Sequence, residues 1–293
     1  MKRRRPQGSR GGGWTAGRTL KLCLVAAVLA SAGYLLWLPD VGTLKTKNPK
    51  TTAYIELRKA RAAKQKKKFR VQMTWVGFDQ VSEHLKHAVI TAEDGAFYRH
   101  KGVDWGNIRV ALIKDLKLRR FAYGGSTITQ QLARNLYLSP SKNPLRKLKE
   151  FLIARRLERT LGKRRIFELY LNVAEWGNGI YGVEAASQAY FGKPAAALTA
   201  DEAVAMAVVL PSPRRHSPAR RGRYVERNMA RIYRRMRASG LLPDEEEAVE
   251  DPEGEEADET GGEEYTLEPS SAVVAGAEAP ASAEKQPAQW PRM

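Results

Sequence analysis

Apolar and polar positions divide this 293-residue chain into three stretches. Residues 20–38 are almost wholly apolar, residues 73–242 repeat apolar side chains at helical spacing, and residues 244–293 hold few large apolar side chains. The helical repeats of the middle stretch are Val81, Leu85, Ala88, Val89 and Ala92; Ile108, Ala111, Leu112 and Leu116; Leu145, Leu148, Leu152 and Leu157; and Ile166, Leu169, Tyr170 and Val173. No convincing run of alternating strands appears. The pattern predicts a mostly α-helical domain of about 170 residues, a usual single-domain size.

One helix start is marked by its own chemistry. Thr199-Ala200-Asp201-Glu202 has the spacing of a capping box, in which the Thr and Glu side chains satisfy each other's backbone N–H groups. An apolar segment follows, and Pro211 ends it.

The apolar run near the N-terminus is long enough to cross a bilayer, which takes about 20 residues. Tyr34 and Trp37 stand near its far end, where interfacial aromatic residues are favoured. The alternative is a cleaved signal peptide with Ala30-Ser31-Ala32 at the cleavage site, but an apolar core of about 7–15 residues is expected there. We therefore predict an uncleaved transmembrane helix at 19–38. The positive-inside rule modestly favours a cytoplasmic N-terminus, since basic residues lie on both sides of the helix.

Composition divides the chain further. The predicted parts are a basic cytoplasmic segment at 1–18, the anchor at 19–38, a basic juxtamembrane stalk at 39–72, a folded helical domain at 73–243 and a disordered acidic tail at 244–293. Residues 53–70 of the stalk are predicted to be helical, either as a solvated spacer or in contact with anionic headgroups.

The charge is strongly uneven. Residues 244–293 hold 16 Asp/Glu and 2 Lys/Arg, a net charge of −14, so with a total of +18 the rest of the chain carries +32. A basic body of this kind binds polyanions. No zinc-finger spacing, RNP motif or basic zipper is present, so nucleic acid is not expected as a partner. The single cysteine, Cys23, excludes an intramolecular disulfide, and neither a cysteine cluster nor an HExxH motif predicts a zinc site.

Glu93 ends an apolar helical pattern and is followed by Asp94, Phe97 and His100. Apolar surroundings raise the pKa of a carboxyl group and neighbouring cations lower it, so a glutamate between the two titrates near neutral pH. Such a group suits general base catalysis. The alternative is an ordinary surface glutamate at a helix end.

A Gly-Gly-Ser-Thr sequence precedes the next helical segment. It predicts a helix N-terminus with Ser126 as the N-cap, and the exposed N–H groups of such an end attract anions. The helix carries Gln130, Gln131, Arg134 and Asn135, which can all donate hydrogen bonds. The alternative is an ordinary turn and cap, and no Walker A lysine follows.

Glu150 lies among cations. Arg146 is four residues earlier and shares its helix face, and Lys142, Lys147 and Lys149 are close in sequence. The pattern indicates either a salt-bridged surface helix or a carboxylate with cations arranged around a diphosphate, with Glu150 as a candidate ligand of a divalent cation.

These residues form ordered blocks that resemble the signature blocks of the peptidoglycan glycosyltransferases, glycosyltransferase family 51. The blocks are Glu93-Asp94-x-x-Phe97-x-x-His100-x-Gly102, Gly125-Ser126-Thr127-Ile128-Thr129-Gln130-Gln131-Leu132-x-Arg134-Asn135, Arg146-Lys147-x-x-Glu150, Arg165-Ile166-x-Glu168-x-Tyr170-Leu171-Asn172, and Gly182-Val183-Glu184-x-Ala186. The resemblance runs from about Trp75 to Pro218, and Asn172-Val173-Ala174-Glu175-Trp176-Gly177 resembles the monofunctional, membrane-anchored biosynthetic transglycosylases in particular.

The resemblance implies a mostly α fold: a lysozyme-like glycosyltransferase domain with a membrane-facing jaw subdomain, preceded by one N-terminal transmembrane helix. It implies an enzyme of bacterial cell-wall synthesis that polymerises lipid II into β-1,4-linked glycan strands, inverts the donor anomeric carbon and releases undecaprenyl diphosphate. Glu93 corresponds to the base that deprotonates the acceptor 4-hydroxyl. Glu150 corresponds to the second essential glutamate, near the donor diphosphate.

The resemblance also implies binding residues and surroundings. The implied substrate-binding residues are Asp94, Phe97, His100, Ser126, Thr127, Gln130, Gln131, Arg134, Asn135, Lys142, Arg146 and Lys149. A divalent cation, Mg or Mn, is expected at Glu150, and no organic cofactor is expected. The expected partners are lipid II, the growing glycan chain, the bilayer and cell-wall assembly proteins. The expected place is the bacterial inner membrane, single-pass, with a cytoplasmic N-terminus and a periplasmic catalytic domain. Leu118, Phe121, Tyr123 and Leu136 are candidates for the jaw, or for the core.

Three other functions were weighed against this one. A lysozyme-type hydrolase leaves Arg134, Arg146 and Lys149 unexplained, since it needs no diphosphate site. A second, penicillin-binding domain is not expected, because the SxxK-like sequence that ends at Lys142 is not followed by Lys-Thr-Gly. A lipid-binding scaffold without catalysis is disfavoured because both glutamates are present.

Overall fold

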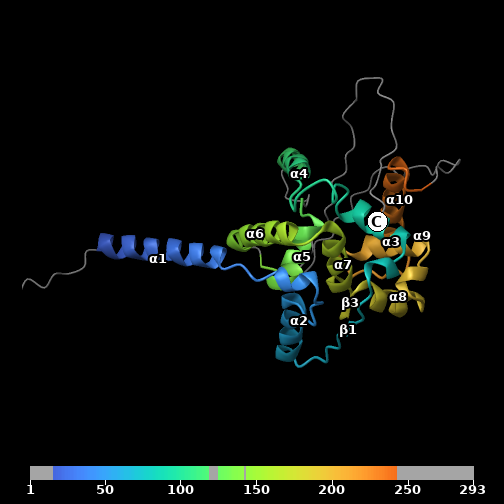
Figure 1. Cartoon of the computed structure of the whole chain (residues 1–293), viewed down its shortest axis with the longest axis horizontal. Helices are drawn as coiled ribbons and strands as arrows, with labels where there is room; N and C mark the ends of the chain where they lie inside the picture. The colour runs from blue at the N-terminus through green and yellow to red at the C-terminus, as the bar shows by residue number, and fades with distance from the viewer. Residues whose placement is uncertain (1–15, 119–124, 142, 243–293) are drawn as a thin grey trace, which may run out of the picture. The chain divides into compact units, whose positions relative to one another are not determined.

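The computed structural model of the chain describes residues 16–118, 125–141 and 143–242, and these residues are mostly helical (Figure 1). The α-helices of this part are α1 (Ala16–Leu36), α2 (Ala53–Lys64), α3 (Glu83–Glu93), α4 (Trp105–Leu118), α5 (Ile128–Tyr137), α6 (Pro144–Thr160), α7 (Lys163–Val173), α8 (Val183–Phe191), α9 (Ala200–Val209) and α10 (Arg223–Ala238). Short 3₁₀ turns lie at Gly42–Lys45, Phe78–Gln80 and Ala195–Ala197. The helical periods predicted a helix at each of α3, α4, α6 and α7, and the capping box predicted the helix at α9.

Helix α1 is a candidate membrane span. Its segment Gly17–Leu36 is 20 residues long with a mean hydropathy of 1.9, and none of its most apolar window is buried. A signal sequence near the N-terminus has the same character, so retention of the anchor stays a prediction. The chain divides into two units, Met1–Leu38 and Pro39–Met293.

The core of the second unit has two groups of helices. Helix α5 packs against α6 and α7, and α3 packs against α9 and α10. Figure 1 shows α7 between these two groups. The fully buried side chains include Leu85, Val89, Ile128, Leu132, Ile153, Leu157, Ile166, Leu169, Ala203 and Met206. The two residues proposed for chemistry come from different groups, since Glu93 ends α3 and Glu150 lies within α6.

Side chains cap the helices that carry these residues. Ser82 accepts the N–H of Leu85 at the start of α3, and Asn143 accepts the N–H of Leu145 at the start of α6, where proline occupies the first turn. At α9, Thr199 and Glu202 form the capping box that the sequence predicts. Each cap fixes the residue at which a helix begins, and so fixes which side chains share its faces.

A small sheet completes the fold. Strand β1 (Gln72–Met73) pairs in parallel with β3 (Ile180–Tyr181), and β3 pairs in antiparallel with β2 (Glu175–Gly177), in the order β1-β3-β2. Strands of two or three residues are too short to show the alternation from which a strand is predicted. This explains why the sequence pattern does not reveal them.

Helix α2 is fastened to this sheet. Tyr54 and Ile55 are buried in a cluster with Tyr181. The Tyr54 hydroxyl donates to Glu175 Oε2 over 3.2 Å, and Arg58 forms an ion pair with the same carboxylate at 3.4 Å. The helix ends at Lys64, not at residue 70 as predicted. One face of this segment therefore packs on the domain, whereas the lysines beyond Lys64 are exposed.

Arg165 fixes the residues ahead of α2. Its guanidinium donates to the backbone carbonyls of Leu44 and Lys47, over 2.8 and 3.2 Å, and to Asn48 Oδ1 over 2.7 Å. We call this set of contacts the Arg165 clasp. It holds residues 44–48 against α7.

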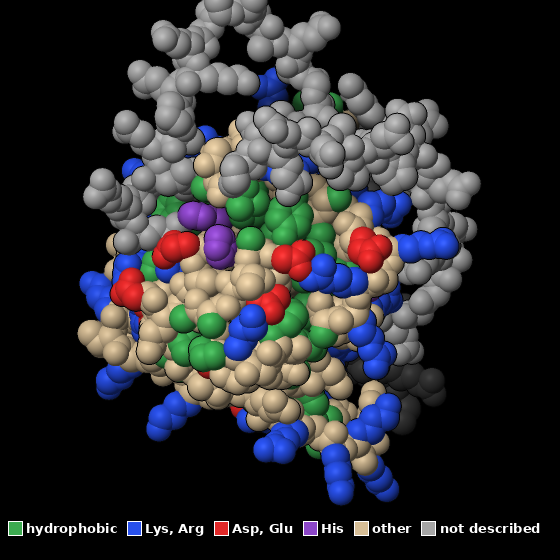
Figure 2. Space-filling view, turned by 90° about the vertical axis from the view of Figure 1, so that its right-hand side faces the viewer, with side chains coloured by type: hydrophobic (Ala, Val, Ile, Leu, Met, Phe, Trp, Pro, Cys, Tyr) green, Lys and Arg blue, Asp and Glu red, His purple; other side chains and the backbone are tan. Residues whose placement is uncertain are grey.

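The side of the molecule where α8, α9 and α10 lie has a characteristic distribution of charge. Figure 2 shows Asp and Glu side chains across this face with Lys and Arg side chains beside several of them, and further Lys and Arg side chains along its lower edge. Charges of the two signs are therefore mixed on this face.

Candidate active site

Glu93 is buried, with 3% of its surface exposed. Burial raises the pKa of its carboxyl group to about 7, while the hydrogen bond from Gln131 and the charge of Arg134 act in the opposite direction and Asp94 adds to the rise. A carboxyl with this pKa exists in both protonation states near neutral pH. It can therefore accept a proton and later release it.

Gln131 and Tyr170 orient the carboxylate of Glu93. Gln131 Nε2 donates to Glu93 Oε2 over 2.7 Å, and the Tyr170 hydroxyl donates to Gln131 Oε1 over 3.2 Å. Because Oε1 can only accept, the tyrosine contact determines which end of the amide faces the glutamate. Burial raises the pKa of Tyr170 well above its ordinary value, so its O–H donor is retained. We call these three residues the base relay.

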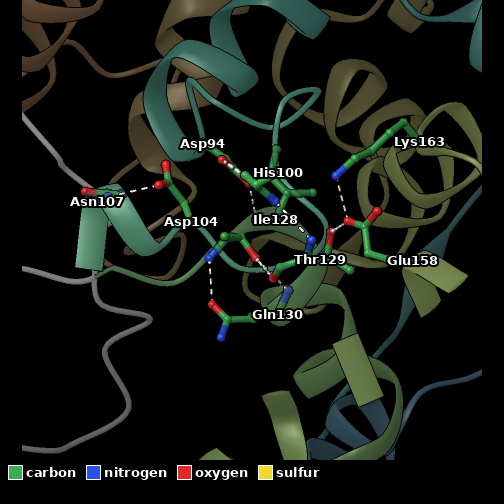
Figure 3. Close-up of polar contacts among 11 residues, drawn as sticks. Asp94, His100, Asp104, Asn107, Ile128, Thr129, Gln130, Glu158 and Lys163 are labelled. Atoms are coloured by element: carbon green, nitrogen blue, oxygen red, sulfur yellow. Dashed lines mark hydrogen bonds and ion pairs between the residues drawn. The ribbon is translucent and has the colours of Figure 1, made fainter. Parts of the chain in front are cut away.

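Asp94 joins the loop after α3 to the N-terminus of α5 (Figure 3). Its carboxylate accepts the N–H of Ile128 over 2.9 Å and is 2.9 Å from His100 Nε2. The other ring nitrogen of His100 accepts the N–H of Gly102 over 3.1 Å. His100 therefore carries a proton on Nε2, and this N–H donates a hydrogen bond to Asp94. Asp94 and His100 thus position the loop that follows Glu93.

The N-cap of α5 is Thr127, and the prediction of Ser126 is wrong. Thr127 Oγ1 accepts the N–H of Gln130 over 3.2 Å, and Gln130 Oε1 accepts the N–H of Thr127 over 3.0 Å. The reciprocal pair needs Gln or Glu three residues after the cap, and Ser126 is followed at that distance by Thr129. The first helical N–H, predicted to attract an anion, is bonded to Asp94 instead.

Gly102 lets this loop approach α6. Its φ is +89°, and a Cβ there would lie 2.9 Å from Cγ of Glu158 and 3.3 Å from the carbonyl oxygen of Ala154. Glu158 also accepts hydrogen bonds from Thr129 Oγ1 and Lys163 Nζ, over 2.6 and 2.7 Å, as Figure 3 shows. These contacts fix α5, α6 and the loop against one another.

Glu150 and its cations form a second cluster. The Glu150 side chain is 0% exposed, Arg146 Nη1 is 2.5 Å from its Oε2, and Lys147 Nζ is 2.7 Å from its Oε1. Lys147 also donates to Ser126 Oγ over 2.6 Å. The expected pairing of Arg146 with Glu150 is confirmed. We call Ser126, Arg146, Lys147 and Glu150 the cation cluster, and α5 connects it to the base relay because Gln131 lies five residues after Ser126.

The other predicted binding residues are placed as follows. Phe97 is fully buried, 5.6 Å from the ring of Phe167, so it contributes to the core. Asn135 is buried on α5, and burial lowers the pKa of Lys149. Arg134 is partly buried, and its Nε makes no hydrogen bond with a residue that the structure describes. Lys142 lies outside the described residues. Substrate contact stays a prediction for each residue of the set.

The described residues do not fit a protein-built metal site at Glu150. Both of its carboxylate oxygens are already engaged by Arg146 and Lys147. Across residues 16–118, 125–141 and 143–242, no group of three His, Cys, Asp or Glu side chains could hold a metal ion. The divalent cation remains a prediction from the resemblance, and no chemical step below depends on it.

Sequence reasoning missed two members of the site. The sequence pattern places Tyr170 in an apolar helical repeat, because its ring is buried like its neighbours and its hydroxyl leaves no signal in the pattern. Lys147 was noted near Glu150 but left out of the predicted site. Its three-residue spacing to Glu150 is the signal that would have identified it.

The jaw candidates are only partly covered by the structure. Leu136 is 7% exposed and belongs to the core, which decides between the two predicted alternatives for this residue. The side chains of Leu118, Phe121 and Tyr123 lie outside what the structure describes. Large exposed apolar side chains are found instead on α4 and α6: Trp105, Leu112, Ile113, Leu116, Leu145 and Leu148. We call these six the apolar surface. The jaw itself stays a prediction.

Comparison with known proteins adds to this geometry. The family model described as "Transglycosylase" matches residues 60–237. A "Biosynthetic peptidoglycan transglycosylase" from Azoarcus sp. (strain BH72) is 46% identical over 204 residues, 68% of this chain and 88% of that protein. Proteins of the same name from Laribacter hongkongensis and Chromobacterium violaceum are each 42% identical, over 72% and 73% of this chain and 94% and 98% of their own lengths.

Proposed function

This chain belongs to the transglycosylase family and is a peptidoglycan glycosyltransferase of cell-wall synthesis, and we propose that it polymerises lipid II into β-1,4-linked glycan strands. The donor anomeric carbon is inverted and undecaprenyl diphosphate is released. The observation that supports this reaction most directly is the buried Glu93 with a pKa of about 7, oriented by Gln131.

Glu93 acts as the general base. Its carboxylate takes the proton of the acceptor 4-hydroxyl while the hydroxyl oxygen attacks the anomeric carbon of the donor. The new C–O bond forms as the bond to the diphosphate oxygen breaks, and the electron pair leaves with the diphosphate. Because Gln131 occupies Oε2, Oε1 is left to accept the proton.

The cation cluster serves the leaving group. Negative charge develops on the donor diphosphate as its bond breaks, and cations already in place stabilise that charge without reorganising. Glu150 orients Arg146 and Lys147 through two ion pairs, and Arg134 and Lys149 add positive charge from α5 and α6. A glycosidase that transfers to water would have no use for this arrangement.

The membrane enters through the substrate. A polyprenyl chain resists leaving the bilayer, since each exposed CH₂ costs about 0.8 kcal/mol. The apolar surface, where Trp105 is 66% and Leu116 is 69% exposed, suits contact with lipid. In the proposed arrangement the chain is a single-pass protein of the bacterial inner membrane, with a cytoplasmic N-terminus and a periplasmic catalytic domain.

The function is tested with the purified full chain and lipid II in detergent. Gel separation should show a ladder of glycan products, together with released undecaprenyl diphosphate. Digestion of the products by a β-1,4-muramidase reports the stereochemistry. Release of soluble fragments from finished cell wall, without polymer from lipid II, would identify a lysozyme-type hydrolase and overturn the proposal.

A further inference from the structure

Helix α10 carries an unusual row of like charges. It holds six arginines and one glutamate. Arg223, Arg227, Arg231 and Arg235 follow one another at four-residue spacing, and we call them the arginine ladder. Residues four apart are neighbours on a helix surface, and like charges there repel one another and destabilise the helix. A bound anion would remove this repulsion.

The opposite face of α10 fixes the helix in place. Its buried residues are Val225, Met229, Ile232 and Met236, and the helix packs against α3 and α9. Arg223 and Arg227 are exposed, while Arg231 and Arg235 are half-buried. The ladder thus runs from open surface toward the interior of the domain.

Arg231 and Arg235 of the ladder bond to neutral groups of the described residues. Arg231 donates to the neutral amide of Asn228 over 3.0 Å, and Arg235 donates to the carbonyl of Thr91 over 3.4 Å. A second nitrogen of Arg235, Nη2, is buried and finds no acceptor within the described part of the chain. None of the ion pairs among residues 16–118, 125–141 and 143–242 involves a ladder arginine. Glu226 is the single carboxylate of α10, so most of the positive charge of the ladder is left for an anion from elsewhere.

The end of α10 turns the chain sharply. Gly240 has φ +68° and donates its N–H to Arg237, and the N–H of Leu241 reaches the carbonyl of Met236 over 2.9 Å. This pair of bonds is a Schellman motif, which ends a helix by reversing the backbone. The acidic sequence begins at Asp244, two residues beyond Leu242, the last residue described.

That sequence matches the ladder in charge and in reach. Residues 244–264 hold 13 Asp/Glu and no Lys or Arg. Twenty-one extended residues cover about 70 Å, whereas a 16-residue helix such as α10 is about 24 Å long. The segment can therefore run back along the whole of α10.

We propose that residues 244–264 dock on the arginine ladder, so that the chain covers its own cationic helix. The last ladder residue, Arg235, donates to the carbonyl of Thr91, which lies two residues before Glu93. Docking therefore brings negative charge toward the rim of the active site. Docking also withdraws the ladder from other anions, including lipid headgroups.

The test measures the distance between the two parts in the full chain. Two cysteines, Ala257→Cys and Ala230→Cys, are introduced into a Cys23→Ser background and carry spin labels for pulsed electron resonance in detergent. Ala230 is exposed on α10. We expect a short, narrow distance distribution at low salt. Near 1 M salt, where charges are screened beyond about 3 Å, the distribution should widen at least about twofold.

A matched pair of variants assigns the docking surface. Arg223→Gln with Arg227→Gln should widen the distribution as salt does. Lys64→Gln with Lys67→Gln removes the same charge from exposed positions at the end of α2 and just beyond that helix. This pair should leave the distance distribution narrow. A distribution that is broad at low salt, or unchanged by the arginine pair, overturns the proposal. So does a broad distribution combined with loss of binding to anionic phosphatidylglycerol vesicles in the arginine pair, which would make the ladder a membrane contact.

Discussion

Gln131 donates its side-chain N–H to the carboxylate of Glu93 across 2.7 Å, although the two residues lie on different helices, α5 and α3. The bond opposes the effect of burial on the Glu93 pKa. Without it, the base would hold its proton to higher pH. In the proposed mechanism the contact therefore helps to determine the pH range of catalysis.

Gln131→Met should displace the pH–rate profile. A hydrogen bond to a charged group contributes about 1.5–3 kcal/mol, so its loss should move the acid limb upward by about one to two pH units from a value near 7. The rate should recover at high pH, where Glu93 is ionised again. Gln188→Met is the control, since Gln188 makes a similar contact with Glu184 on the exposed side of α8. An unchanged acid limb would contradict the role of Gln131.

Tyr170→Phe should shift the acid limb in the same direction by a smaller amount. The variant keeps the ring but leaves Gln131 Oε1 unsatisfied, so the amide is less firmly oriented toward Glu93. Unfolding free energy should fall by about 1–3 kcal/mol. Tyr181→Phe loses another buried hydroxyl contact, the one to Glu175. It should lower the free energy of unfolding by a similar amount and leave the acid limb of the pH–rate profile unshifted. Equal profiles for the two variants would make Tyr170 purely structural.

Glu93→Gln should reduce polymerisation by about 10²–10⁴-fold or more, because the base is lost. The variant should also be more stable than the parent at high pH. The folded-state pKa is raised from 4.5 to about 7, so ionised Glu93 costs stability that is absent below pH 4.5 and reaches about 3 kcal/mol above pH 7. Urea unfolding at pH 4.5 and pH 8 measures this difference. Substantial activity in the variant would refute the assignment of the base.

Glu150→Gln should lower kcat/KM by about 100-fold, since Arg146 and Lys147 lose the carboxylate that positions them for the diphosphate. The measurement is steady-state polymerisation of lipid II with a divalent metal present. Glu56→Gln breaks a similar three-residue carboxylate–lysine pair on the surface of α2 and should behave as the parent. Parent-like rates for Glu150→Gln would limit this residue to a structural role.

Leu112→Gln with Leu116→Gln should separate membrane contact from chemistry. Both side chains are exposed on α4, and each leucine buried in lipid contributes about 1.5–3 kcal/mol. We expect slower polymerisation of lipid II in liposomes and a parent-like rate in detergent. A loss of activity in both would indicate damage to the fold, whereas no loss in either would exclude the apolar surface from membrane contact.

The helices were predictable because their apolar repeats are long and their caps are local. Thr199 and Glu202 are three residues apart, so their capping box is written in the sequence. Strands β1 and β3 were not predictable. Each is two residues long, and the paired residues are more than 100 positions apart, so they leave no periodic signal in the sequence. The same limit hid the Glu175 carboxylate that receives Tyr54.

Within the site, local spacing identified one cluster and long-range contact made the other. Arg146 and Glu150 share a turn of one helix, so the sequence alone indicated their pairing. Glu93, Gln131 and Tyr170 come from three helices, and no spacing rule connects them. Ser126 was taken as the cap because the choice between Ser126 and Thr127 depends on which side chain Gln130 can reach.

The Arg165 clasp has a consequence for how this region can vary among related sequences. Its acceptors at Leu44 and Lys47 are backbone carbonyls, which every amino acid supplies. Substitutions at the exposed position 47 therefore leave its contact intact, whereas Asn48 supplies a side-chain acceptor and lacks that freedom. The donor side has no such freedom, because one guanidinium makes every contact. A single substitution of Arg165 would release residues 44–48 from α7, whereas substitutions at positions 44 and 47 keep the carbonyls that accept its hydrogen bonds.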